Sequence, residues 1–270
     1  MSPVTFTLKD IPRQRVDCSA LTPTRLAGRS PADIAAIELP CGNRKPRVEE
    51  LFELQGEDTS SLVFRNACDK LDRIGEAMFD GSIEVEGDTG AYLGLGLRGG
   101  RITVRGNCGA FAAAEMKRGL VHVCGNAGDF LGAALPGNRQ GMRGGMVIVG
   151  GNVADRCADR LRRGSILIEG DAGDYCASRM IAGTLAVLGT VGAYPGFAMR
   201  RGTLLLTTPP ASLPATFGDC GTHDLRFLPL LVQSWKSLES RFAQLAPNAR
   251  VRRFMGDLAC DGKGEVLVWL

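Results

Sequence analysis

The stretch GGRITVRGNCGAF, residues 99 to 111, places four glycines around a short alternating apolar segment. Glycine inside a strand or helix costs about 0.5 to 1 kcal/mol relative to alanine, so this density needs a structural cause. Ile102 and Val104 alternate with polar residues, which is the period of a β-strand with one buried face. The stretch therefore predicts a short strand bounded by turns that favour glycine.

The same pattern recurs along most of the chain. The glycines that open the apolar segments lie 19 residues apart, with one step of 26, at Gly81, Gly100, Gly119, Gly145, Gly164, Gly183 and Gly202. A methionine or leucine stands three residues before each of them. This spacing leaves too little chain for a strand, its loops and a crossover helix of about a dozen residues. Each repeat is therefore predicted to be one coil of a parallel β-solenoid, stacked about 4.8 Å from the next.

The predicted fold is mainly β, a right-handed parallel β-helix with about 19 residues per coil. Right-handed winding is expected because about 98% of parallel crossovers have that hand. The segment SLVFRNACDKLDRIGEAM, residues 61 to 78, keeps the apolar columns without the glycines and is predicted to form a degenerate first coil. We expect an N-terminal capping segment over 1–60, the β-helix over 61–208, and a C-terminal cap over 209–270. This cap is predicted to contain a helix at 229–247 and a hairpin around Asp261 to Gly264.

Bulk composition restricts the classes of partner and compartment. A net charge of +3 from 32 basic and 29 acidic residues gives no reason to expect nucleic acid as a partner. The sequence has no signal peptide pattern and no run of about 18 apolar residues, so we expect a cytoplasmic protein that does not enter a membrane. Nine cysteines without a C-x-x-C pair predict buried free thiols and no metal site.

A column of basic residues stands two residues before the opening glycines. It comprises Arg98, Lys117, Arg143, Arg162 and Arg200, which we call the basic ridge. Like charges on rungs about 5 Å apart repel each other, so the ridge is expected to bind carboxylates of an acidic partner or of an anionic cofactor. A solvated ridge without a ligand is the alternative.

Two other features predict contacts with a partner chain. The outward strand positions Ile148, Leu167, Ala186 and Leu205, here called the apolar stripe, are expected to dock against another chain, with packing of the terminal segments as the alternative. Seven extra residues between Phe130 and Met142 predict a projecting loop. Its polar tip, Asn138 and Arg139, is the predicted partner contact, and a bulge without function is the alternative.

The sequence offers little support for catalysis by this chain, and we assign it no catalytic residue. GLGLRG at residues 94 to 99 matches a dinucleotide fingerprint but precedes a strand, so it is rejected. His122 and His223 are each interpreted as ordinary surface residues. Asp129, Asp155 and Asp174 occupy the same coil position and are expected to cap turns. The alternative is that they are paired carboxylates in a free-standing carbohydrate-active β-helix enzyme.

The recurring units GEAMFDGSIEVEG, AEMKRGLVHVCG, QGMRGGMVIVGG and SRMIAGTLAVLG resemble the repeat found in the C subunit of formylmethanofuran dehydrogenase. The bacterial counterpart of that protein is the C subunit of the formyltransferase/hydrolase complex. The repeats of residues 75 to 208 carry the resemblance, with departures from glycine at Ala113, Ala158, Ala177 and Arg139. A similar glycine-repeat solenoid forms the C-terminal domain of the glutamate synthase large subunit, so a structural domain of that kind is a further alternative.

The resemblance implies a non-catalytic scaffold subunit of a cytoplasmic complex in tetrahydromethanopterin-dependent one-carbon metabolism, of the type found in methylotrophs. Such a complex converts formyl-tetrahydromethanopterin to formate through a methanofuran-type cofactor. Amidohydrolase-like and formyltransferase-like chains would be the partners, and other subunits would carry the metals and the chemistry. Methanofuran analogues bear polyglutamate tails, which the basic ridge would suit. No other cofactor is expected on this chain.

Overall fold

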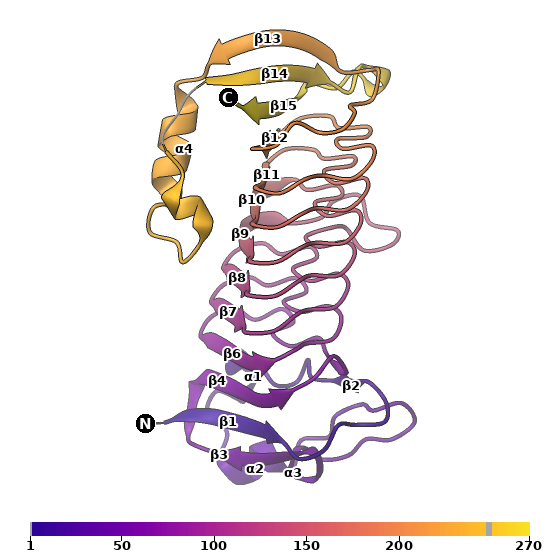
Figure 1. Ribbon diagram of the computed structural model, residues 1–270. Coiled ribbons are helices and arrows are strands. Elements are labelled where there is room, and N and C mark those ends of the chain that lie inside the picture. The colour runs from indigo at the N-terminus through magenta and orange to yellow at the C-terminus, as the bar shows by residue number, and fades with distance from the viewer. Residues whose placement is uncertain (1, 247–249) are drawn as a thin grey trace.

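The protein is a tall stack of short coils with an antiparallel layer at each end (Figure 1). The computed structural model describes residues 2–246 and 250–270. One sheet of 13 strands runs the length of the described chain in the order β13-β14-β15-β12-β11-β10-β9-β8-β7-β6-β4-β1-β3. The fold is mainly β, and most of its strand pairs are parallel, as the sequence predicts.

The middle of the sheet consists of seven parallel strands, one in each coil. They are β6 (Ser82–Gly87), β7 (Arg101–Val104), β8 (Leu120–Val123), β9 (Arg143–Val149), β10 (Arg163–Ile168), β11 (Thr184–Val187) and β12 (Thr203–Leu206). Ile83 pairs with Ile102, and Ile102 with Val121, so residues 19 apart lie over one another. Val121 then pairs with Val147 across the single step of 26. The predicted register is confirmed, and the extra residues leave the ladder intact.

Two glycine positions show why the repeat needs this residue. Gly100 has φ +76°, and a Cβ there would lie 2.4 Å from the carbonyl oxygen of Gly81 in the coil before. Gly106 lies at the other end of the strand, where a Cβ would meet Asp88 Oδ1 at 2.3 Å and the Gly87 carbonyl oxygen at 2.6 Å. Both positions are closed to larger residues because the backbones of neighbouring coils nearly touch.

A ladder of side chains joins the coils just after this second glycine. The Asp88 carboxylate accepts the backbone N–H of Asn107 at 2.7 Å, and the Asn107 amide oxygen accepts the N–H of Asn126 at 2.8 Å. The series continues through Asn152, Asp171 and Thr190. These bonds satisfy turn donors that would otherwise lack a protein partner, and they hold each coil to the next beyond the sheet itself.

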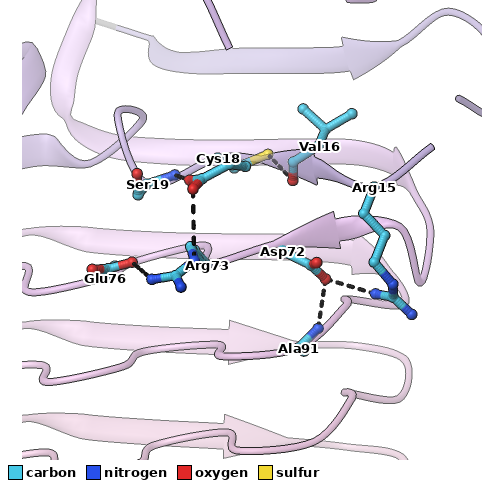
Figure 2. A network of polar contacts seen from close by, with 9 residues as sticks. Arg15, Val16, Cys18, Ser19, Asp72, Arg73, Glu76 and Ala91 are labelled. Carbon is cyan, nitrogen blue, oxygen red and sulfur yellow. Dashed lines mark hydrogen bonds and ion pairs between the residues drawn. The ribbon is translucent and has the colours of Figure 1, made fainter. Parts of the chain in front are cut away.

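The chain before β6 is a mixture of short helices and strands. It contains β1 (Pro3–Leu8), β2 (Val16–Asp17), α1 (Pro23–Leu26), α2 (Pro31–Ala35), α3 (Val48–Leu51), β3 (Phe52–Gln55), β4 (Asp58–Ala67) and β5 (Leu71–Asp72). Strand β4 pairs in parallel with β6 through Leu62 and Ile83, which confirms the degenerate first coil. Figure 2 shows Asp72 accepting hydrogen bonds from the Arg15 side chain and from the Ala91 backbone, both at 2.7 Å. The segment is thus tied to the first coils.

The C-terminal segment adds three strands beyond the last coil. They are β13 (Gly218–Asp224), β14 (Arg250–Gly256) and β15 (Gly264–Trp269), with the short 3-10 helix η2 (Leu258–Cys260) between the last two. Strands β14 and β15 form the predicted antiparallel hairpin, and β15 pairs in parallel with β12. This layer covers the far end of the stack.

The C-terminal helix is shorter than predicted, and it lies along the side of the stack instead of over its end. The sequence predicts a helix over 229–247, whereas α4 spans Phe227–Trp235 and is followed by the 3-10 helix η1 (Arg241–Gln244), with residue 247 outside the described residues. Figure 1 shows α4 beside the stack, along the sheet rather than over its end. Its buried residues Leu228, Val232 and Trp235 form a second core with the apolar stripe.

The assignment of the apolar stripe to a partner interface is therefore wrong. Ile148, Leu167 and Leu205 are 2%, 0% and 1% exposed, because the chain's own α4 and η1 cover them. The alternative, packing of a terminal segment, is confirmed. The sequence explains why α4 covers the stripe: Leu228, Val232 and Trp235 recur at helical spacing and give α4 an apolar face.

Candidate functional surfaces

The residues of the basic ridge occupy equivalent positions in their coils, on the surface of the stack. Arg98, Lys117, Arg143, Arg162 and Arg200 are all exposed. Each donates its backbone N–H to the methionine or leucine carbonyl of the coil before, at 2.6 to 2.8 Å. Ile181 fills the equivalent position between Arg162 and Arg200, donating to the Leu161 carbonyl. The structure thus brings the five predicted cations to one edge, with one apolar interruption.

Parts of the ridge are already engaged by the chain itself. Arg162 Nη1 donates to Gln140 Oε1 at 2.8 Å, and Arg143 lies 3.9 Å from the Glu115 carboxylate. The Arg98 guanidinium lies over the Phe79 ring, 4.8 Å from its centroid. Among the described residues, Lys117 and Arg200 form no salt bridge. These two cations are the ones most available to an external carboxylate.

The seven-residue insertion forms a loop that is pinned to the ridge side of the stack. The Glu115 carboxylate accepts hydrogen bonds from the Leu135 backbone, at 3.2 Å, and from the Asn138 side chain. Arg160 donates to the Asn138 carbonyl. Asn138 and Arg139 are exposed, as expected of a projecting loop. Their role as partner contacts stays a prediction.

A pocket of about 220 Å³ lies between this loop and the solenoid. Phe111 and Phe130 form one wall, with ring centroids 4.7 Å apart, and Arg160 and Arg179 form another. Asp159, only 3% exposed, accepts two hydrogen bonds from Arg179 at 2.8 Å and one from Ser178 Oγ at 2.6 Å. Because this buried carboxylate is already satisfied, it supports the wall rather than offering a free acid.

The aligned aspartates cap turns, as expected. The Asp129 carboxylate accepts the backbone N–H of Asp155 at 3.0 Å, and Asp155 accepts that of Asp174 at 2.8 Å. Asp174 accepts the N–H of Ala193 at 2.7 Å. Each carboxylate is thus bonded to the next coil through Oδ1, which is the turn-capping role expected of it.

Comparison with known proteins identifies relatives of this chain. No protein-family model matches the sequence. The C subunit of tungsten-containing formylmethanofuran dehydrogenase 2 from Methanococcus maripaludis is 38% identical over 80 residues, 29% of this chain and 29% of that protein. The C subunit of the formyltransferase/hydrolase complex Fhc from Methylorubrum extorquens is 41% identical over 84 residues, 31% of each. The aligned segment therefore spans less than a third of these curated relatives.

A solved structure extends the similarity over nearly the whole chain. A chain of the formyltransferase/hydrolase complex FhcABCD from Methylorubrum extorquens, crystallised with methylofuran, superimposes with a TM-score of 0.93 at 39% identity. The match covers 98% of this chain and 99% of that one. The chain belongs to the family of formylmethanofuran dehydrogenase C subunits. The glutamate synthase alternative is not supported by these matches.

One surface feature of this family member was missed by the sequence reasoning. One coil position carries an aromatic residue or an arginine in successive coils and has a left-handed backbone, with φ between 56° and 63°. Its residues are Arg73, Tyr92, Phe111, Phe130, Arg156, Tyr175 and Tyr194. Their side chains stack, with ring centroids 5.4 Å apart for Tyr92 and Phe111 and 5.0 Å for Tyr175 and Tyr194. Arg156 lies 4.6 Å over the Tyr175 ring. The 19-residue spacing that located the glycines would have revealed this column too.

The remaining candidate groups of this family member are dispersed. All nine cysteines are free thiols, of which Cys18, Cys108, Cys157 and Cys176 are buried and Cys220 is exposed. Burial raises the pKa of Cys108 to about 12, so this thiol stays protonated. Within residues 2–246 and 250–270, no three His, Cys, Asp or Glu side chains gather as metal ligands would. No helix in those ranges is long and apolar enough to span a bilayer.

Proposed function

We propose that this chain is the scaffold subunit of a formyltransferase/hydrolase complex in tetrahydromethanopterin-dependent one-carbon metabolism. In that role it holds subunits that convert formyl-tetrahydromethanopterin to formate through a methanofuran-type cofactor. The observation that carries the proposal is the near full-length likeness to a chain of a formyltransferase/hydrolase complex solved with methylofuran. The partners we propose are amidohydrolase-like and formyltransferase-like chains, in the cytoplasm.

A non-catalytic role is supported by how the polar side chains are used. The Asp129, Asp155 and Asp174 carboxylates and the ladder that begins at Asp88 and Asn107 all accept backbone N–H groups of the next coil. Side chains used in this way hold neighbouring coils together, which is the work of a scaffold. In this proposal the solenoid is right-handed over 61–208, and segments 1–60 and 209–270 cap it.

We place the anionic tail of the methanofuran-type cofactor on the basic ridge. The donor chemistry fits, because guanidinium and ammonium groups bind carboxylates through charge-assisted hydrogen bonds. Lys117 and Arg200 are the cations free to do so, whereas Arg143 and Arg162 would bind while still holding the insertion loop. The cofactor supplies the amine that carries the formyl group, and this chain's residues only bind and orient the tail. Asn138 and Arg139 are proposed to contact a partner subunit beside it.

Affinity purification from the native cell tests the scaffold role. A tag on this chain is expected to recover an amidohydrolase-like and a formyltransferase-like chain in fixed proportion, and the purified chain alone should not release formate. Recovery of the chain without such partners would remove the proposal. So would formate release by the isolated chain.

Charge reversal tests the ridge separately. Lys117→Glu with Arg200→Glu should lower retention of the cofactor in the purified complex at least about tenfold, which corresponds to 1.4 kcal/mol. Arg25→Glu with Arg29→Glu changes the net charge equally on exposed residues that do not belong to the ridge and should retain the cofactor. Equal retention by both double variants, with the complex intact, would contradict cofactor binding by the ridge.

A further inference from the structure

The N-terminal segment contains a second basic surface, which shares no residue with the ridge. A groove of about 770 Å³ lies between residues 12–14 and the hairpin of residues 38–47. Its lining includes Arg13, Gln14, Asn43, Arg44 and Lys45. Three cations from two segments about thirty residues apart thus meet in one hollow. We call it the N-terminal basic groove.

Backbone bonds fix the hairpin that brings these charges together. Cys41 and Arg44 exchange backbone hydrogen bonds at 2.9 and 3.1 Å around Gly42, and Leu39 donates to the Pro46 carbonyl at 2.8 Å. Gly42 has φ +59°, and a Cβ there would overlap the Gln14 side chain, so the hairpin tip lies directly on the opposite wall. The groove is therefore built into the fold.

That opposite wall is fixed equally well. Lys70 Nζ donates to the Pro12 carbonyl at 2.8 Å, and the Arg15–Asp72 ion pair of 2.7 Å, visible in Figure 2, holds the end of the same stretch. The hairpin is attached to β2, because the Pro40 carbonyl accepts the Asp17 N–H at 2.8 Å, and β2 pairs with β5. Hydrogen bonds thus connect both segments that carry Arg13, Arg44 and Lys45 to the first coils.

The three cations of the groove form no salt bridge within the described residues, whereas Glu50, an acidic residue of its lining, is bonded to the backbone of Arg47. Arg47 pairs with Glu49 at 3.5 Å, and Glu50 accepts the Arg47 backbone N–H at 2.8 Å. Over the described residues, Arg13, Arg44 and Lys45 form no salt bridge, and all three are exposed. Three unpaired cations around one hollow repel each other unless carboxylates or other anions bind there.

We propose that the N-terminal basic groove is a docking site for an acidic segment of another protein chain. Its volume lies within the range of about 300 to 1,000 Å³ that is typical of small-molecule and cofactor clefts, well above the need of one small anion. Ile11, two residues before Arg13, is 71% exposed, and arginine is among the residues enriched at protein interfaces. The proposal holds whichever complex the chain joins, so it can fail or stand independently of the proposed function.

Peptide binding to the full-length chain tests the groove. The probe is a fluorescein-labelled hexa-aspartate peptide, followed by fluorescence anisotropy at low ionic strength. Arg13→Glu, Arg44→Glu and Lys45→Glu together should weaken binding at least about tenfold, because attraction becomes repulsion. The matched control reverses Arg25, Arg29 and Lys263, which are exposed and lie outside the groove. An equal loss in the control variant would overturn the proposal.

Two further measurements separate a protein segment from a small anion. Inorganic phosphate should displace the peptide no better than chloride at equal ionic strength, and selective displacement by phosphate would overturn the proposal in favour of a small-anion site. In the complex purified from its native cell, a carbodiimide should couple Lys45 to an aspartate or glutamate of another chain, and Lys45→Arg should abolish that link. Coupling of Lys45 only within its own chain would also overturn it.

Discussion

The two halves of the solenoid share one inner face and differ on the outer one. On the outer face of β6 to β8, the residues in register are Glu84, Thr103 and His122. Glu84 forms an exposed salt bridge of 2.7 Å with Arg105. The next residue of that column is Ile148, and from there the apolar stripe lies under α4. Strand pairing is the same in both halves. The outward residue therefore decides what covers a coil without affecting how the coil is made.

The covered half depends on a long connection back along the chain. After the last coil the chain passes through β13 and returns along the sheet as α4, which buries Trp235 completely. The end of this segment is held at Glu169 of β10's coil, whose carboxylate accepts Ser240 Oγ and the Arg241 backbone N–H, both at 2.7 Å. The difference between the halves can be tested by changes of decreasing size.

The largest effect is expected from a charge under the helix. Leu167→Asp places a carboxylate at a fully buried position among the apolar side chains of the second core, so the protein should lose about 3 to 5 kcal/mol of unfolding free energy or release α4. Thr103→Asp, at the same position of the polar half, should change it by less than about 0.5 kcal/mol. Urea unfolding followed by tryptophan fluorescence measures both, and similar shifts would contradict the comparison.

Shortening a side chain of α4 should give the next effect. Leu228→Ala removes a fully buried side chain and leaves a cavity, costing about 2 to 3 kcal/mol because a surface helix relaxes partly around it. Leu230→Ala, on the same helix but 73% exposed, is the control and should cost little. The rate of protease cleavage within residues 225–245 should rise only in the first variant. Equal cleavage of the two would mean that α4 does not pack as described.

Loss of the contact at Glu169 should lower the free energy of unfolding by less than the change at Leu228. Glu169→Gln weakens two charge-assisted hydrogen bonds at the start of η1 and should cost about 1 kcal/mol. Hydrogen exchange of the amides of residues 241–245 should quicken, while the sheet amides of β6 to β8 stay protected. Glu86→Gln, which removes an exposed ion pair with Arg65 in the polar half, serves as the control. Faster exchange in both halves would disprove a local effect.

The smallest effect concerns pH at the boundary between the halves. Burial lowers the pKa of His122 below its usual value, although Glu239 and Glu169 oppose the shift. Between the lowered pKa and that of the unfolded chain, about 6.5, the unfolded state binds more protons. Stability should therefore fall as the pH drops below about 6.5. His122→Gln should flatten that slope in unfolding curves, and an unchanged slope would exclude His122 as its source.

Much of the fold follows from one sequence period. Glycine and valine or isoleucine columns 19 residues apart define the inner face, because neighbouring coils present the same atoms at every step, as Ile83 on Ile102 and Gly100 on Gly81 show. The period also locates the basic ridge and the capping aspartates. Within the repeats, prediction succeeds because the neighbours of a residue are known from its position alone.

Prediction fails where the period ends. The apolar stripe was assigned to a partner because nothing in its own coils tells which apolar face will cover it, and α4 lies outside the repeats. The N-terminal basic groove escaped notice for the same reason, since Arg13 meets Arg44 and Lys45 only through the fold of the non-repeating segment. In both cases long-range packing, rather than local pattern, brings the residues together.

The ladder of Asp88, Asn107, Asn126, Asn152 and Asp171 makes the molecule modular in length. Every rung offers one acceptor to the rung above and takes none from beyond its neighbour, so in the polar half, where α4 does not cover the sheet, each coil depends mainly on the one beneath it. Excising one whole period there, such as residues 82–100, would rejoin equivalent atoms, whereas removing part of a coil between its strand and its turns would misalign the columns that follow. Gene duplication or loss of single coils could therefore lengthen or shorten the distance between the two ends while leaving both ends unchanged.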